Sequence, residues 1–153
     1  GRIDHLQQVH AIWGQDTRDE AIAEVASVMR RGLREHDMVI EAGSPQGDPS
    51  FTVLARNADE SEAGMIARRL LEQIAQAQVQ GMSDGFGLTA SFGVAARRHD
   101  ESVDEWHARA GSALDAAQNQ GEDQVLTATE WEEISLLPSP EQPVPNEGDS
   151  KAA

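Results

Sequence analysis

The sequence predicts an α/β (α+β) sandwich in which a mixed sheet is flanked by helices. Three observations lead to this fold class. Four segments carry apolar residues at helical spacing, short β-type runs lie between them, and turn-forming residues separate the two kinds of segment. The chain has 153 residues, enough for one hydrophobic core, and only 4% of them are aromatic. Aliphatic side chains and alanine must therefore fill that core.

The expected elements follow from periodicity and from residues that begin or end helices. Gly14 is a typical helix stop, Asp16 or Thr17 can cap a second helix, and Asp59 or Ser61 can begin a third. The expected helices are residues 3–13, from Asp16 or Thr17 to about Arg34, 59–79 and 102–120; the expected strands are 38–40, 51–54, 88–95 and 124–127. Turn formers fill residues 41–50, so the first two strands form a hairpin with a long loop.

The C-terminal part of the chain has a different composition. Four prolines and several acids follow Leu137, with little to bury, which is typical of a solvated segment. We therefore divide the chain into a domain of residues 1–128 and an acidic, Pro-rich linker or tail of residues 129–153. Trp131 and the apolar residues after it fit either a helix that packs back on the domain or the first turn of a signalling helix.

The charge of the chain excludes several classes of partner. The formal net charge is −15, and residues 1–128 alone carry 21 acids against 11 bases, a net charge of −10. Such a surface repels phosphates and anionic lipid headgroups, so we expect neither a nucleic acid nor a membrane as partner. The chain has no Cys and no apolar run of about 20 residues, which is compatible with a cytoplasmic protein.

Six segments, in order and nearly in register, resemble the GGDEF (diguanylate cyclase-type) family over residues 2–127. Arg2–Gly14 is similar to D-x-D-x-F-K-x-[IV]-N-D-x-x-G, Arg34–Asp37 to R-x-x-D, Gly47–Phe51 to G-G-[DE]-E-F, Leu88–Ala95 to V-T-V-S-I-G-V-A, Ala110–Gln118 to A-D-x-A-L-Y-x-A-K and Gly121–Val125 to G-R-N-R-V. The resemblance implies a nucleotidyl-cyclase-like fold, in which two domains meet face to face, each with one GTP, and Mg²⁺ ions assist their joining into cyclic di-GMP. It also implies a central first strand, which this chain would have truncated or missing.

The resemblance implies carboxylates for Mg²⁺, polar groups for guanine and cations for phosphate, and the chain departs from the family at these positions. Arg2 stands at the position of the first metal-binding Asp, and His10 and Ala11 stand at the positions of the Asn-Asp pair that reads guanine. The signature motif reads Gly47, Asp48, Pro49, Ser50 and Phe51, in which Pro49 and Ser50 replace the acidic pair. Gln118 and Glu122 replace the phosphate-facing Lys and Arg. A second alignment, with the turn at residues 43–46, restores no acidic pair. We therefore predict that the chain is not an enzyme and holds no metal or other cofactor.

Arg34 and Asp37 match the motif that the family uses as an inhibitory site for cyclic di-GMP, where Arg pairs with a phosphate and Asp reads a guanine edge. The alternative is that Arg34 caps the preceding helix and pairs with Asp37. The doublets Arg30-Arg31, Arg68-Arg69 and Arg97-Arg98 are expected to be solvated or salt-bridged, with docking to an acidic partner as the alternative.

Together these features predict a regulatory or interaction module of a cyclic di-GMP signalling protein without enzyme activity. The acidic tail suits a linker to an EAL domain. Gly47–Phe51 is reminiscent of FimX-like proteins, which act in type IV pilus function and twitching motility. The alternative is a receptor for cyclic di-GMP or GTP that uses Arg34 and Asp37 or a remnant of the active-site pocket. Expected partners are other domains of the same protein, such as an EAL domain, or separate proteins, and a homodimer is left open.

Overall fold

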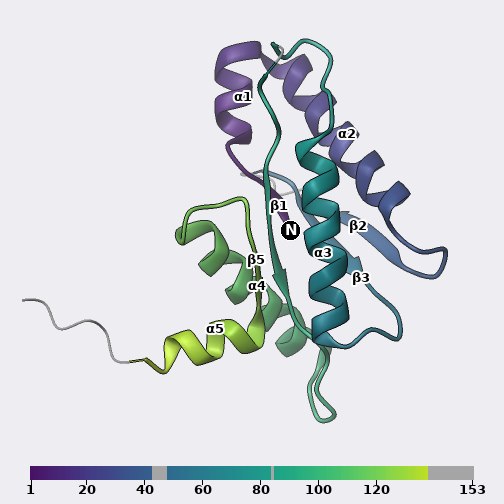
Figure 1. Cartoon of the computed structure of the whole chain (residues 1–153), viewed down its shortest axis with the longest axis vertical. Coiled ribbons are helices and arrows are strands. Elements are labelled where there is room, and N and C mark those ends of the chain that lie inside the picture. The colour runs from purple at the N-terminus through teal and green to yellow at the C-terminus, as the bar shows by residue number, and fades with distance from the viewer. Residues whose placement is uncertain (43–47, 84, 138–153) are drawn as a thin grey trace, which may run out of the picture.

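A computed structural model describes residues 1–42, 48–83 and 85–137 of the chain and shows a five-stranded sheet covered by helices (Figure 1). In chain order the elements are β1 (Arg2–Ile3), α1 (Leu6–Trp13), α2 (Gln15–Gly32), β2 (Met38–Ala42), β3 (Ser50–Leu54), α3 (Glu60–Ala75), β4 (Ala90–Val94), α4 (Val103–Asn119), β5 (Val125–Thr127) and α5 (Ala128–Ser135). The strand order is β2-β3-β1-β4-β5. Only the β4–β5 pair is parallel, so the sheet is mixed and the predicted α/β sandwich is confirmed.

The first strand is present and short. Strand β1 has two residues and lies in the middle of the sheet, where it pairs antiparallel with β3 and β4. The prediction that helix begins at residue 3 is therefore wrong. Arg2 and Ile3 are held extended by two neighbouring strands, and His5 adopts a left-handed conformation (φ 53°) that separates β1 from α1.

The helix ends follow local capping chemistry at some positions and tertiary contacts at others. Asp59 caps α3 and Ser102 caps α4, each through a reciprocal capping box with a Glu three residues later. Helix α2 follows Gly14 without a side-chain cap, so the predicted caps are wrong. Helix α3 ends at Ala75 instead of residue 79, yet Val79 is buried, because the segment after the helix folds back onto the core.

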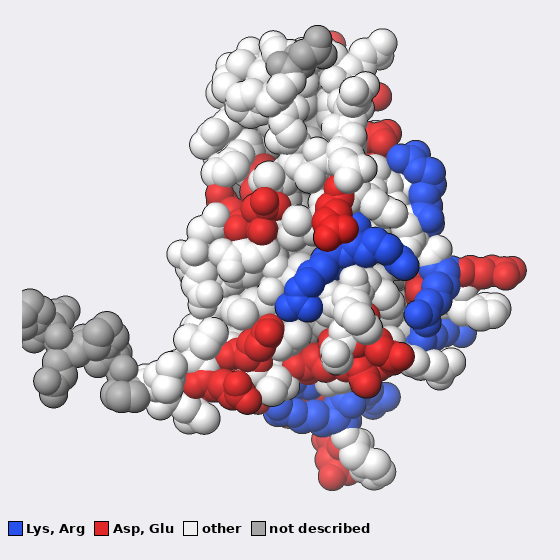
Figure 2. All heavy atoms as spheres, viewed as in Figure 1, with Lys and Arg blue, Asp and Glu red and all other residues white. Residues whose placement is uncertain are grey.

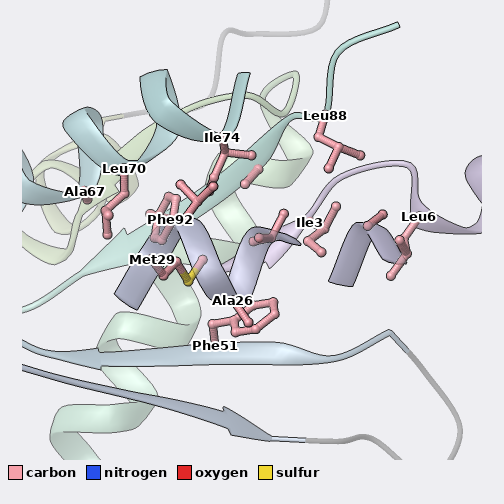
Figure 3. Packing of buried hydrophobic residues seen from close by; sticks show 14 of the residues in the cluster. Ile3, Leu6, Ala26, Met29, Phe51, Ala67, Leu70, Ile74, Leu88 and Phe92 are labelled. Atoms are coloured by element: carbon pink, nitrogen blue, oxygen red, sulfur yellow. The ribbon is translucent and has the colours of Figure 1, made fainter. Parts of the chain in front are cut away.

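The main core lies between the sheet and the helices α1, α2 and α3. Phe51 of β3 is 1% exposed and points toward Ala26 and Met29 of α2 (Figure 3). Leu70 and Ile74 of α3 and Phe92 of β4 complete the same cluster. Strand β4 alternates, because Phe92 and Val94 join this cluster while a Cβ atom at Gly93 would meet the backbone of α4. Helix α4 therefore covers the opposite face of the sheet.

Helix α5 packs against α4 and β5 and is also held by arginines. Trp131 packs against a small cluster formed by Ala116, Ala117 and Leu126. Arg98 contacts Glu132 at 2.6 Å, and Arg68 lies 3.9 Å from Glu130. The doublets are thus salt-bridged at these positions, as expected, and Arg31 pairs likewise with Glu24. The proposed boundary between residues 128 and 129 stays a prediction; α5 begins at Ala128.

Candidate functional site

The centre of the sheet brings together the positions that the sequence assigned to metal binding. In the β1–β3 pair Arg2 lies opposite Ser50, and in the β1–β4 pair it lies opposite Ser91. Directly opposite residues in antiparallel strands have Cβ atoms roughly 5 Å apart. The fold thus places Arg2 and Ser50 side by side, although 48 positions separate them in the chain.

The guanidinium of Arg2 reaches from β1 to helix α4. Its Nη1 atom donates to Asp115 Oδ1 at 3.1 Å and to Gln118 Oε1 at 2.9 Å. The side chains of Arg2 and Asp115 are 40% and 61% exposed, so solvent screens the ion pair. Two of the degenerate positions, Arg2 and Gln118, are therefore in direct contact.

Asp4 is the buried polar centre of this region. It is 3% exposed, and its two carboxylate oxygens have different partners. Oδ1 accepts from the Ser91 hydroxyl at 2.9 Å, and Oδ2 accepts from the backbone N–H of Asp123 at 3.0 Å. Because a buried charge must be hydrogen-bonded to be tolerated, these bonds join the segment after β1 to β4 and to the α4–β5 turn.

The backbone around Asp4 is unusual. His5, Glu122 and Asp123 have positive φ angles of 53°, 61° and 49°, which side-chain-bearing residues adopt at an energetic cost. His5 Nε2 lies 2.6 Å from Glu122 Oε2, and Asp4 holds the amide of Asp123. These contacts keep the strained residues in place, so Glu122 also belongs to this cluster.

The residues present do not fit the Mg²⁺ that the resemblance implies. Mg²⁺ requires oxygen ligands in near-octahedral geometry, whereas the two facing positions hold the cationic Arg2 and the neutral Ser50. The nearby Asp4 carboxylate is already engaged by a hydroxyl and an amide. Across residues 1–42, 48–83 and 85–137 no group of three or more His, Cys, Asp or Glu side chains could hold a metal ion.

The structure describes only part of the hairpin motif Gly47–Phe51. Gly47, like the alternative turn at 43–46, lies outside the described residues. Asp48 accepts from Arg18 of α2 at 3.1 Å, and both side chains are largely buried. Pro49 is buried, Ser50 begins β3 and Phe51 enters the core. Arg18 therefore anchors the hairpin to α2 through a residue of the motif itself.

The remaining predicted residues lie apart from this cluster. His10 and Ala11 are exposed on α1. Asp37 accepts from the backbone N–H groups of Arg34 at 3.2 Å and Arg56 at 3.1 Å, while Arg34 is exposed beyond the end of α2. The expected link between Arg34 and Asp37 exists, but it is made by the main chain of Arg34.

Sequence reasoning missed the residues that hold this region together. Asp4, Asp115, Asp123 and Ser91 are not among the candidate site residues that the sequence predicts. The available signal was the match of Asp4 to the second Asp of the opening motif. Its partners could not be found, because Ser91 and Asp123 lie 87 and 119 positions away in the chain.

A comparison with known protein families identifies the family that the sequence motifs resemble. Residues 1–124 match the family model described as "Diguanylate cyclase, GGDEF domain". Among curated proteins, the chain is 26% identical over 125 residues to the diguanylate cyclase DgcM of Escherichia coli K12. The match covers 82% of this chain and 29% of DgcM. The chain thus spans less than a third of the length of that relative.

Solved structures give the same result. The diguanylate cyclase SiaD of Pseudomonas aeruginosa, in complex with its activator SiaC, matches with a TM-score of 0.74 and 28% identity over 82% of this chain and 47% of SiaD. The GGDEF domain of DgcB from Caulobacter crescentus, in complex with cyclic di-GMP, has a TM-score of 0.73 and 26% identity over 84% of this chain and 74% of that one. Both likenesses include sequence as well as fold.

These findings correct one prediction. We predicted that the chain is not an enzyme, but the matching family and the curated relatives are diguanylate cyclases, so that prediction is wrong. It inferred the class of the protein from side-chain types at a few positions, whereas residues 1–124 as a whole match the family and the fold matches its solved structures. Among the described residues, no helix is long and apolar enough to cross a membrane. The chain belongs to the GGDEF family of diguanylate cyclase domains.

Proposed function

We propose that this GGDEF domain acts as a regulatory and interaction module in bacterial cyclic di-GMP signalling and is joined to an EAL domain. Membership of the family supports the signalling context. The complex of the related SiaD with its activator SiaC supports regulation through protein contacts. The proposed role does not depend on turnover by the domain itself.

The observation that carries the proposal is the contact of Arg2 with Asp115 and Gln118. It connects the centre of the sheet to α4. Helix α4 in turn packs against α5 through Trp131, and α5 is the last described element before the Pro-rich tail. A continuous path of packed elements therefore leads from the family's active-site positions to the segment that would reach the next domain.

The test uses the natural full-length protein and measures its hydrolysis of cyclic di-GMP. If the domain regulates an EAL neighbour, Arg2→Ala changes the hydrolysis rate by about fivefold or more, because it releases β1 from α4. Arg30→Ala, which removes another exposed arginine from the outer side of α2, serves as the control and leaves the rate unchanged. A natural chain without an EAL domain, or equal rates for the two variants, would overturn the proposal.

The motif Gly47–Phe51 extends the proposal to type IV pilus function. In a strain that carries the natural gene, we expect Arg2→Ala to reduce the twitching zone on agar, with Arg30→Ala as control. Normal twitching in the Arg2→Ala strain, at equal protein level, would remove this part of the proposal.

A second candidate function is a receptor for cyclic di-GMP at Arg34 and Asp37. One observation favours it: the Arg34 side chain is exposed, three positions before Asp37. The related GGDEF domain of DgcB has been solved with cyclic di-GMP. An Arg guanidinium can hold a phosphate with two parallel hydrogen bonds, which Lys cannot reproduce.

Calorimetric titration of the chain with cyclic di-GMP tests this candidate. We expect binding that Arg34→Ala abolishes and Arg30→Ala leaves intact. Absence of heat for the unmodified chain would exclude the receptor. A parallel titration with GTP separates the two sites, since binding of GTP that survives Arg34→Ala would assign it to the remnant of the active-site pocket.

A further inference from the structure

Helix α5 lies beyond the part of the chain that matches the family. The match ends at residue 124, and α5 covers Ala128–Ser135. Of the eight residues of α5 only Ala128 is buried, and the main core, as far as the structure describes it, takes no side chain from this helix. An element with few buried apolar contacts opens at a lower free energy than the core. We therefore expect α5 to open locally while the sheet and the other helices stay folded.

Arginines of the domain face the acidic side of α5. Nη2 of Arg98 donates to both carboxylate oxygens of Glu132, at 2.6 and 2.9 Å. Nη1 of Arg109 lies 3.9 Å from Oε1 of the same carboxylate, and Nη2 of Arg68 lies 3.9 Å from Glu130 Oε1. In Figure 2 acidic and basic side chains gather in the lower half of the molecule, where Figure 1 shows α5. Opposite charges therefore hold α5 on a chain whose net charge is −15.

The same surface also has an apolar part, which receives an aromatic ring. Trp131 of α5 packs against Ala116 and Ala117 of α4 and against Leu126 of β5. We define the α5 seat as the surface formed by Arg68, Arg98, Arg109, Ala116, Ala117 and Leu126. A short helix with one aromatic anchor and carboxylates beside it is complementary to this seat, as in other grooves that bind an amphipathic helix.

Helix α5 leaves part of the binding capacity of the seat unused. Nη1 of Arg109 is buried and has no hydrogen-bond partner among the described residues. Its distance of 3.9 Å from Glu132 is too long for a hydrogen bond, and so is the distance from Arg68 to Glu130. The side chains of Arg98 and Glu132 are 55% and 44% exposed, so solvent screens their ion pair. A carboxylate about 1 Å closer to Arg109 would satisfy a buried donor that α5 does not.

We propose that the α5 seat is a docking surface for an acidic amphipathic helix of a partner protein, and that α5 occupies the seat in cis until such a helix displaces it. The chemistry of the occupant follows from the contacts of α5 itself. A basic helix would be repelled by the three arginines, and an apolar helix would leave the buried donor of Arg109 unsatisfied. Docking at this seat requires neither an EAL neighbour nor turnover by the domain.

Hydrogen exchange of the full chain, followed by NMR, tests whether α5 opens by itself. We expect the amides of residues 132–135 to exchange at least about 100-fold faster than those of Leu70 and Ile74 in the core. Glu132→Gln should speed the exchange of α5 by about threefold or more, because it weakens the contact with the arginines. The matched control is Glu133→Gln, at the next position, which is exposed and should leave the exchange unchanged. Equal effects of the two variants, or exchange of α5 as slow as that of the core, would overturn the proposal.

A synthetic peptide with the sequence of residues 127–137 serves as the acidic helix that tests docking. It keeps the capping box of Thr127 and Glu130, and a fluorescent label on its N-terminus reports binding by anisotropy. We expect the peptide to bind the full chain with Trp131→Ala and Glu132→Gln at least about tenfold more tightly than the unmodified chain, where α5 competes in cis. Glu132→Gln alone should give a smaller gain in the same direction.

A second peptide, with Glu130→Gln and Glu132→Gln, tests the part played by the arginines. It should bind the released chain about threefold or more weakly than the first peptide, since it offers no carboxylates. Circular dichroism should show that all chain variants are folded. Absence of binding to the released chain at about 1 mM peptide, equal affinities for the released and unmodified chains, or equal affinities of the two peptides would each overturn the proposal.

Discussion

One buried carboxylate, that of Asp4, joins distant segments of the chain at the centre of the sheet. Its oxygens satisfy the Ser91 hydroxyl and the Asp123 amide, and both bonds cross large distances in the sequence. Asp115 is also an acid in a hydrogen bond, with Arg2, but it is 61% exposed. Water can replace the hydrogen-bond partner of an exposed carboxylate but not that of a buried one. Asp4 therefore contributes more than Asp115 to the free energy of unfolding, although both are carboxylates.

We expect Asp4→Ala to lower the free energy of unfolding by about 2–3 kcal/mol, since it leaves buried polar groups without an acceptor. Asp115→Ala should cost less than about 1 kcal/mol. Urea unfolding followed by circular dichroism measures both. Equal costs for the two variants would show that Asp4 is not the centre of the network.

At the scale of elements, the approach of α4 to the sheet depends on Gly93. A Cβ atom at this position would overlap the carbonyl of Ala110 and the backbone of Leu114. We expect Gly93→Ala to destabilise the protein by about 3 kcal/mol or more, because the clash is with backbone that cannot rotate away.

Gly111 on the same helix is the control, since a Cβ atom there would meet nothing within 4 Å. Gly111→Ala should stabilise the protein by about 0.5–1 kcal/mol through helix propensity. Thermal unfolding of both variants tests the pair. A Gly93→Ala protein as stable as the unmodified chain would show that α4 can shift away from β4.

The loop between β4 and α4 is held by the ion pair of Glu101 and Arg109. The hydrogen bond from the Arg109 guanidinium is the main cause that lowers the pKa of Glu101 to about 2 from the ordinary value of 4.5, and the backbone N–H of Arg98 contributes. The same bond raises the pKa of Arg109. Glu132 of α5 lies 3.9 Å from Arg109, so this loop also faces α5.

A carboxylate whose pKa is lowered by folding stabilises the protein above its unfolded pKa and loses that contribution as the pH falls toward its folded pKa. We therefore expect the melting temperature of the unmodified chain to exceed that of Glu101→Gln at about pH 5, and the gap to close toward about pH 2.5. Glu133→Gln, at an exposed position on α5, is the control and should show no such gap. A gap that is constant with pH would contradict the role of Glu101.

At the scale of the whole molecule, the net charge lowers the stability of the folded state. The net charge of −15 makes the compact state repel itself, and the ion pairs of the arginines offset only part of this repulsion. We expect the melting temperature to rise by a few degrees between about 20 mM and about 300 mM NaCl, as salt screens the repulsion. Differential scanning calorimetry measures it, and a fall in melting temperature would show that the surface ion pairs outweigh the repulsion.

The sequence by itself determined the elements whose signals are local. Asp59 and Ser102 mark the starts of α3 and α4, because a capping box is complete within four residues. The hairpin and the family motifs are likewise properties of contiguous residues. They were sufficient for the fold class, for the expected positions of the site residues and for the signalling context.

Only the tertiary structure decided which of these residues meet. Strand β1 has no pattern of its own, since two residues become a strand only when β3 and β4 lie on either side. The contact of Arg2 with Asp115 and the burial of Asp4 depend on the register of the sheet and on the closeness of α4 that Gly93 permits. Such contacts join positions more than 80 residues apart, and their geometry follows from the packing of the whole core, which no local pattern encodes.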